Sequence, residues 1–304
     1  MSDRRAARRG RGQTIAPTRR WSRWVPLAAV VGVIAAVGVV AVALNAGGTT
    51  TGQTPWSRLG TSDVHALAFQ GNDPEHVLFG HHGGISESRD GGRSWQPLAT
   101  RDDAMGMRPA DDGSIVIAGH DVFTASRDGG KTWQPIAADL PSLDIHGFAR
   151  DPGDPARMWA ALATGGLWES LDFGARWIEV RRDNVLSLFA TRTGTTTRLL
   201  GVDTTGLVMS DDGGRNWSGL ATPPTYPMTG LAATPDGRII YAGSPDGLYR
   251  STDGGQSWTA TAYKGSAFAI ATSLDGAIVA VVSRETEFFR SPDGGTTWPG
   301  PDRR

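Results

Sequence analysis

Ser88 to Trp95 reads SRDGGRSW, and this eight-residue motif occurs six times in the chain. The other copies are SRDGGKTW (126–133), SLDFGARW (170–177), SDDGGRNW (210–217), STDGGQSW (251–258) and SPDGGTTW (291–298). Their first residues lie 38, 44, 40, 41 and 40 residues apart. A period of this length with a turn motif in every repeat is typical of a β-propeller. We therefore predict an all-β, six-bladed β-propeller of four-stranded antiparallel blades.

The first repeat shows the parts of one predicted blade. Apolar strands are expected at Val64–Phe69, His76–Gly80 and Gly84–Ser88, and the motif turn leads into a fourth strand after Trp95. The text Trp56-Ser-Arg-Leu59 resembles these outer strands, whereas the last motif is followed by Pro-Gly-Pro, which cannot form a good strand. We predict that residues 55–59 complete the last blade, so that the propeller spans 55–304.

The head of the chain differs from the rest in charge. Residues 1–24 carry eight arginines against Asp3, and residues 25–55 carry no charge. The remainder has 22 basic and 30 acidic residues, a balance that argues against nucleic acid as a partner of the propeller. The sequence has no cysteine, which excludes disulfides and thiolate metal sites.

Residues 25–46 are long and apolar enough to cross a bilayer. We predict a basic cytoplasmic tail (1–24), a transmembrane signal anchor (25–46) and a linker (47–54). The propeller would then lie outside the cytoplasm, held to the cell membrane by a single helix, because flanking arginines stay inside. The alternative is a secreted protein, in which the apolar segment is a signal peptide that is cleaved off near the small residues Ala41 and Ala43.

Histidines recur at positions that a four-stranded meander brings to one face. His65 and His146 stand at the start of the first strand of their repeats, where the second repeat has Met105. His82 and His120 both lie six residues before the motif serine, in the loop between the second and third strands. Imidazoles with a thioether are a ligand set for copper, with zinc next. We predict a Cu or Zn site here, and a wet channel mouth lined by histidines is the alternative.

An aspartate precedes the first strand of each of these three repeats. Asp63, Asp103 and Asp144 are expected either to orient the imidazoles or to accept hydrogen bonds from local backbone, and the backbone role is the one we favour.

The motif resembles the Asp-box (BNR) repeat, S-x-D-x-G-x-[ST]-W, over residues 55–304. Its Ser, Asp, second Gly and Trp are in register in all six copies, and a distorted turn is expected in the third, which has Phe173 and Arg176. The resemblance implies a sialidase-like fold, shared by sialidases, xyloglucanases, sortilin-type receptors and photosystem-assembly factors. Segments such as GHHGG and IHGF are similar to uncharacterised bacterial propellers labelled glycosylhydrolase-like.

Sialidase activity itself is not expected, because the Arg-Ile-Pro motif of that family does not occur. A glycoside hydrolase needs two suitably spaced carboxyl groups, for which Asp63, Asp144 and Glu285 are the candidates on the histidine face. We predict a binding module rather than an enzyme. Its expected partners are a metal ion, a glycan or a protein, and its expected state is a monomer.

Overall fold

The computed structural model describes residues 53–183, 185–221, 223 and 227–301. The chain divides into two units, Met1–Gly48 and Thr49–Arg304, and all described residues belong to the second. The predicted tail (1–24) and anchor (25–46) lie outside the described residues, as does the linker up to residue 52. Within the described part, no helix has the length and apolar character needed to span a membrane.

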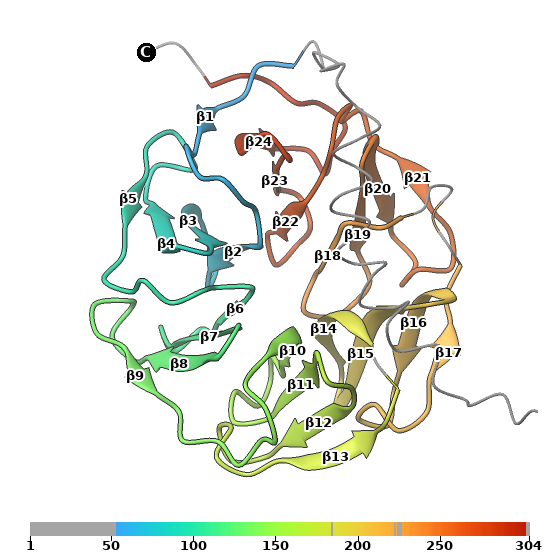
Figure 1. The fold of residues 1–304 in the computed structure, drawn as a ribbon. Helices are drawn as coiled ribbons and strands as arrows, with labels where there is room; N and C mark the ends of the chain where they lie inside the picture. Colours follow the sequence, from blue (N-terminus) through green and yellow to red (C-terminus); the bar gives the residue numbers. More distant parts are fainter. Residues whose placement is uncertain (1–52, 184, 222, 224–226, 302–304) are drawn as a thin grey trace, which may run out of the picture. The chain divides into compact units, whose positions relative to one another are not determined.

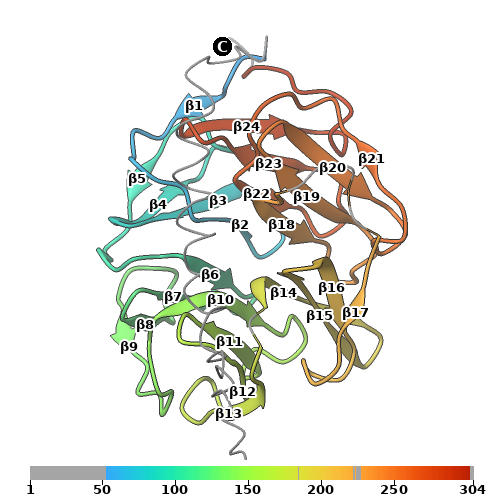
Figure 2. The ribbon, with the colours of Figure 1, turned by 45° about the vertical axis from the view of Figure 1, so that its right-hand side comes forward.

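The described residues form six antiparallel sheets of four strands each, arranged as blades around a centre (Figure 1). The innermost strands contact one another in the cyclic order β2, β6, β10, β14, β18, β22 and back to β2. Figure 2 shows the same succession of blades from a second direction. The predicted six-bladed propeller of four-stranded blades is therefore confirmed.

Blades one to three follow the chain in simple meanders. Blade one is β2 (Ala66–Gln70), β3 (Asp73–His81), β4 (Gly84–Ser88) and β5 (Gln96–Pro97). Blade two is β6 (Gly106–Pro109), β7 (Ile115–Gly119), β8 (Val122–Ser126) and β9 (Gln134–Pro135). Blade three is β10 (Ile145–Arg150), β11 (Met158–Leu162), β12 (Leu167–Ser170) and β13 (Ile178–Arg181).

Blades four to six repeat the pattern, with one change at the end. Blade four is β14 (Leu186–Thr193), β15 (Thr196–Asp203), β16 (Gly206–Ser210) and β17 (Ser218–Gly219). Blade five is β18 (Gly230–Ala233), β19 (Ile240–Ser244), β20 (Gly247–Ser251) and β21 (Thr259–Ala260). Blade six is β22 (Ala269–Thr272), β23 (Val279–Val282), β24 (Glu287–Ser291) and, from the start of the chain, β1 (Ser57–Arg58).

The ring is closed by β1, which pairs with β24 through Ser57 opposite Phe288 and Arg58 opposite Glu287 (Figure 1). The indole nitrogen of Trp56 also donates to the carbonyl of Pro299, at 2.9 Å. Joining the two ends of the propeller in one blade covers an edge that would otherwise be open to pairing. The predicted closure by residues 55–59 is confirmed.

Each motif forms a compact turn whose aspartate collects hydrogen bonds. In the first, the Ser88 hydroxyl donates to Asp90 Oδ1 (2.8 Å), the Gly92 amide donates to Ser88 Oγ (2.8 Å) and the Ser94 hydroxyl donates to Asp90 Oδ2 (2.6 Å). Hydrogen bonds to the charged form lower a carboxyl pKa. In the second copy the Thr132 hydroxyl and amide, with Ser126, bring the pKa of Asp128 to about 2.

The turns also pack against the preceding blade, which explains their glycines. Gly92 of blade one has φ +99°, and a Cβ placed there would lie 2.0 Å from the Phe288 ring of blade six. Trp95 packs edge-on against the same ring, with centroids 5.3 Å apart. The motif is thus a contact between blades as well as a turn within one.

The third turn keeps the serine and backbone-amide hydrogen bonds of the other copies and lacks the one to the second carboxylate oxygen, because Arg176 replaces the Ser or Thr donor; the distortion expected there is wrong. The Ser170 hydroxyl donates to Asp172 (3.0 Å) and the Gly174 amide donates to Ser170 (2.9 Å). Phe173, which replaces the first glycine, takes the left-handed φ of +63° itself. A non-glycine residue can adopt this conformation at a cost of about 1–2 kcal/mol, which the surrounding turn holds in place.

Candidate functional site

The four predicted histidines come from three neighbouring blades and two kinds of position. His65 immediately precedes β2, His146 is in β10, and His82 and His120 lie in the β3–β4 and β7–β8 turns. Glycines near the ends of β3 and β7 let the loop that carries Asp103 pack directly against these two strands. A Cβ on Gly80 would lie 2.6 Å from the Ala104 carbonyl oxygen, and one on Gly119 would lie 2.4 Å from that of Asp103.

Three donor groups meet at the edge of blade one. His65 Nε2 lies 3.0 Å from Asp63 Oδ2 and 3.1 Å from His82 Nδ1. His82 Nδ1 also contacts Asp63 Oδ2, which in addition accepts a hydrogen bond from the His82 amide at 2.7 Å. These three atoms form a small triangle, which we call group one (Asp63, His65, His82).

Two further groups continue along the same face. In group two, Asp103 Oδ2 lies 2.7 Å from His120 Nδ1 and 3.9 Å from His82 Nε2. In group three, Asp144 Oδ1 lies 3.0 Å from His146 Nε2 and 3.8 Å from His120 Nε2. Within each group the donor atoms all lie within 4.8 Å of one another, close enough to share one metal ion.

The groups overlap, so that histidines and aspartates alternate along a single arc. His82 is shared by groups one and two through its two different ring nitrogens, and His120 is shared by groups two and three in the same way. The imidazoles also contact one another, with the rings of His82 and His120 stacked 6.0 Å apart. Groups one and three have no residue in common.

The pKa shifts of His65 and Asp63 favour the protonation states that bind metals. Burial, and next the neighbouring His82, lower the pKa of His65, whose side chain is 16% exposed, so that its imidazole is neutral near pH 7. Burial alone would raise the pKa of Asp63, but the His82 amide and the two imidazoles outweigh it and leave that pKa below its ordinary value. A neutral imidazole and an ionised carboxylate are the forms that bind metals.

The aspartates do more than the backbone role that the sequence favoured. Asp63 accepts from the His82 amide as that role requires, but all three carboxylates also lie against imidazoles. Asp103 Oδ1 is buried without a hydrogen-bond partner and lies 3.7 Å from His65 Nε2. An unsatisfied buried carboxylate oxygen costs free energy, and a cation or proton placed beside it would recover that cost.

Other sequence candidates stay apart from the arc. The donors of the three groups do not include Glu285, which accepts a hydrogen bond from Ser266 within blade six at 3.2 Å. Among the contacts of the described residues, none joins the Met105 sulfur to an imidazole, and its role as a ligand stays a prediction. His81 Nδ1 accepts a hydrogen bond from the Gly83 amide (3.1 Å), and its ring stacks on Phe79.

Comparisons with known proteins agree with the repeat. The BNR/Asp-box repeat model matches residues 249–260, which contain the fifth motif. The chain carries Asp-box repeats. No curated protein matches the sequence.

Solved structures share the fold at low sequence identity. YCF48 from Cyanidioschyzon merolae is 19% identical, with a TM-score of 0.50 over 81% of this chain and 86% of that one. The GH74 xyloglucanase from Xanthomonas campestris is 20% identical, with a TM-score of 0.54 over 80% of this chain but only 46% of its own. A propeller in a nidogen/laminin complex is 12% identical, with a TM-score of 0.61 over 74% of this chain and 93% of that one. These likenesses show the propeller fold alone.

Proposed function

We propose that this protein is a membrane-anchored, extracytoplasmic β-propeller that binds a divalent transition-metal ion, zinc or copper(II), at group one. The anchor is the apolar segment 25–46, and the observation that carries the metal site is the triangle of donor atoms from Asp63, His65 and His82. The repeats supply the scaffold, and the two histidine-bearing positions of blade one supply the ligands.

The size of the triangle supports a metal ion. Zinc–nitrogen bonds are about 2.0–2.1 Å, so two ligand atoms of a tetrahedral site lie about 3.3 Å apart. The separations from His65 Nε2 to His82 Nδ1 and to Asp63 Oδ2 are 3.1 and 3.0 Å. Small outward shifts would admit the ion, and with three protein ligands a fourth position stays open to water or a ligand.

The donor types favour a divalent ion. Two imidazoles with a carboxylate suit Zn(II) or Cu(II), whereas Cu(I) prefers sulfur ligands. Without a thioether in group one, zinc and copper(II) are the expected ions. Because groups one and three share no residue, the arc offers room for a second ion at His120, Asp144 and His146.

Titration calorimetry on the full chain, kept in mild detergent and stripped of metal with a chelator, tests this proposal. Zn²⁺ and Cu²⁺ are titrated into the protein and into His65→Ala. Loss of a direct ligand should weaken the tighter binding step by about 100-fold or more, beyond the 10–100-fold typical of losing a partner that only orients a ligand.

His81→Ala is the matched control, since it removes a histidine on the same face that belongs to none of the three groups. It should leave metal affinity unchanged. Equal affinity in His65→Ala and the unaltered protein, or absence of saturable binding of both ions, would overturn the proposal.

A protein partner is the second candidate. YCF48 has also been solved bound to a D1 peptide, and that propeller is 17% identical, with a TM-score of 0.54 over 77% of this chain. If this chain binds a peptide on its histidine face, the metal-loaded and the metal-free protein should capture different peptides when each is exposed to a random peptide library. Glycoside hydrolysis, for which Asp63, Asp144 and Glu285 were the candidates, would show as turnover in a fluorogenic glycoside screen, and a glycan partner that is bound without cleavage would show on a glycan array.

A further inference from the structure

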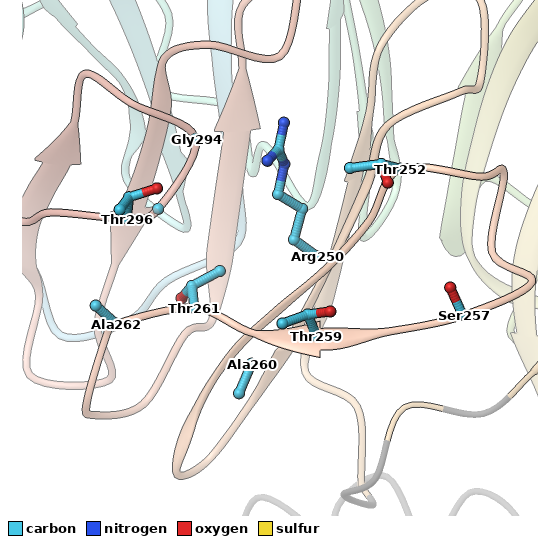
Figure 3. A pocket seen from close by; sticks show the side chains of 10 residues that line it. Arg250, Thr252, Ser257, Thr259, Ala260, Thr261, Ala262, Gly294 and Thr296 are labelled. Carbon is cyan, nitrogen blue, oxygen red and sulfur yellow. The ribbon is translucent and has the colours of Figure 1, made fainter.

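An open pocket of about 510 Å³ lies between blades five and six (Figure 3). This volume is in the range of sites that hold small organic ligands. It is formed by β20, β21 and the fifth and sixth Asp-box turns, and so by elements that contribute nothing to the histidine arc. The lining residues are Arg250, Thr252, Ser257, Thr259, Ala260, Thr261, Ala262, Gly294, Gly295 and Thr296.

The charge in this pocket is Arg250, which stands immediately before the box serine at the end of β20. The same position holds Glu87, Glu169 and Arg290 in blades one, three and six, and each of these has an ion-pair partner within 3.0 Å. Across the described ranges, no carboxylate lies within ion-pair distance of the Arg250 guanidinium. Uncharged Ala125 and Met209 fill this position in blades two and four, so Arg250 is the one charged copy that has no ion-pair partner among the described residues.

The guanidinium is held in place by uncharged groups. Its carbon lies 5.9 Å from the centre of the Tyr241 ring, and a Cβ on Gly294 would be 3.1 Å from it. Burial raises the pKa of Tyr241 to about 12, so this phenol stays neutral and does not balance the cation. Arg250 Nε is buried with no hydrogen-bond partner. Figure 3 shows the side chain extending into the space between Gly294 and Thr252.

Hydroxyl side chains share the lining of the pocket with the cation. The hydroxyls of Thr252 and Thr259 have no partner among the hydrogen bonds of the described residues, while that of Ser257 donates to Asp253 at 2.5 Å. No lining residue is acidic. The nearby carboxylates of Asp253 and Asp293 each accept several hydrogen bonds within their own turns, which hold them there.

We propose that this pocket binds a small hydroxylated molecule bearing an oxyanion, either a carboxylate or a phosphate, with Arg250 paired to the anion and Thr252 and Thr259 bonded to its oxygens. Guanidinium groups recognise both kinds of oxyanion through paired hydrogen bonds. The site lies apart from the histidine arc, and it stands whether or not the arc binds metal.

Calorimetric titration of the full chain at low salt tests the site with three anionic probes: glucuronate, glucose 6-phosphate and inorganic phosphate. Neutral glucose is the comparison. Glucuronate binding alone identifies a carboxylate ligand, and glucose 6-phosphate binding alone identifies a phosphate ligand. Inorganic phosphate binding as tightly as glucose 6-phosphate shows that the anion supplies the affinity.

Arg250→Gln should lower the affinity about 10- to 150-fold, the range that corresponds to losing a hydrogen bond to a charged group. Arg238→Gln is the matched control, because Arg238 is an exposed arginine of the same blade, 3.8 Å from Asp236, and lines no part of the pocket. It should bind as the unaltered protein does. Thr259→Val, which keeps the side-chain shape, should weaken binding several-fold and gives a second measure if Arg250→Gln folds poorly. The proposal is overturned if no anionic probe saturates, or if Arg250→Gln or Thr259→Val binds as tightly as the unaltered protein.

Discussion

Gly92→Ala tests whether the Asp-box glycine is required by the neighbouring blade or only by its own turn. The residue has φ +99°, and an added Cβ would lie 2.0 Å from the ring of Phe288, which is fully buried. Gly255→Ala is the matched control. It occupies the same motif position with φ +89°, but its Cβ would meet a Leu220 methyl at 3.0 Å, the movable end of a flexible side chain.

The two variants share one cost and differ in another. An alanine at positive φ costs about 1–2 kcal/mol in either turn. Forcing a methyl group into a packed aromatic ring adds about 1–3 kcal/mol, since Phe288 has no open space into which to move. We therefore expect a loss in the free energy of unfolding of about 2–5 kcal/mol for Gly92→Ala and about 1–2 kcal/mol for Gly255→Ala.

Chemical denaturation of both variants, followed by tryptophan fluorescence, measures this difference. The six motif tryptophans, one in each repeat, report the unfolding of the whole ring, and one of them, Trp95, packs on Phe288 at the altered contact. Equal losses in the two variants would refute the packing explanation and leave the backbone conformation as the only role of the glycine. A larger loss of unfolding free energy in Gly255→Ala than in Gly92→Ala would contradict the packing explanation outright.

Three further outcomes follow from the contacts. Metal titration should reach two ions per chain, and His146→Ala should remove the weaker step while keeping the one at group one; a single step in the unaltered protein would contradict this. In the stripped protein, the free energy of unfolding should fall as pH drops below 6.5, because burial holds the folded-state pKa of His65 below its ordinary value, and His65→Gln should make this pH dependence shallower. Glu75→Gln should cost about 1–2 kcal/mol in denaturant, since it leaves the buried Arg290 guanidinium without its carboxylate across blades six and one, and no loss would show that this pair is neutral.

The fold was predictable because each motif marks a fixed point in its blade. The third strand of blade one was predicted at Gly84–Ser88, which are the bounds of β4. The second strand was predicted to begin at His76, but β3 begins at Asp73. The polar residues before His76 resemble a loop in sequence, although the backbone of Asp73 still pairs with Gln70 of β2. Such pairing depends on the partner strand, which local sequence does not reveal.

His76 shows the same limit for a side chain. A histidine at the start of a predicted strand is expected on the surface, yet the side chain of His76 is 12% exposed and lies 2.7 Å from Glu87 in the adjacent strand. Polar residues at a strand start favour exposure on average. The strand register that sets His76 beside the Glu87 carboxylate depends on tertiary structure, and it reverses the expectation.

The histidine arc combines a predictable part with one that only the ring supplies. Counting back from the box serines placed His82 and His120 in equivalent loops, and equivalence alone would put each beside the aspartate of its own blade. In the ring, the next blade brings a second aspartate to the opposite side, so His82 lies between Asp63 and Asp103.

Repetition of this step in blade two, where His120 lies between Asp103 and Asp144, turns single residues into a continuous row of imidazoles and carboxylates. The equivalent loop positions of blades three to six hold Thr164, Thr204, Pro245 and Glu285, none of which offers two nitrogens on opposite sides of one ring. The arc must therefore end where the histidines end. Its extent is set by side-chain chemistry, and the propeller supplies only the spacing.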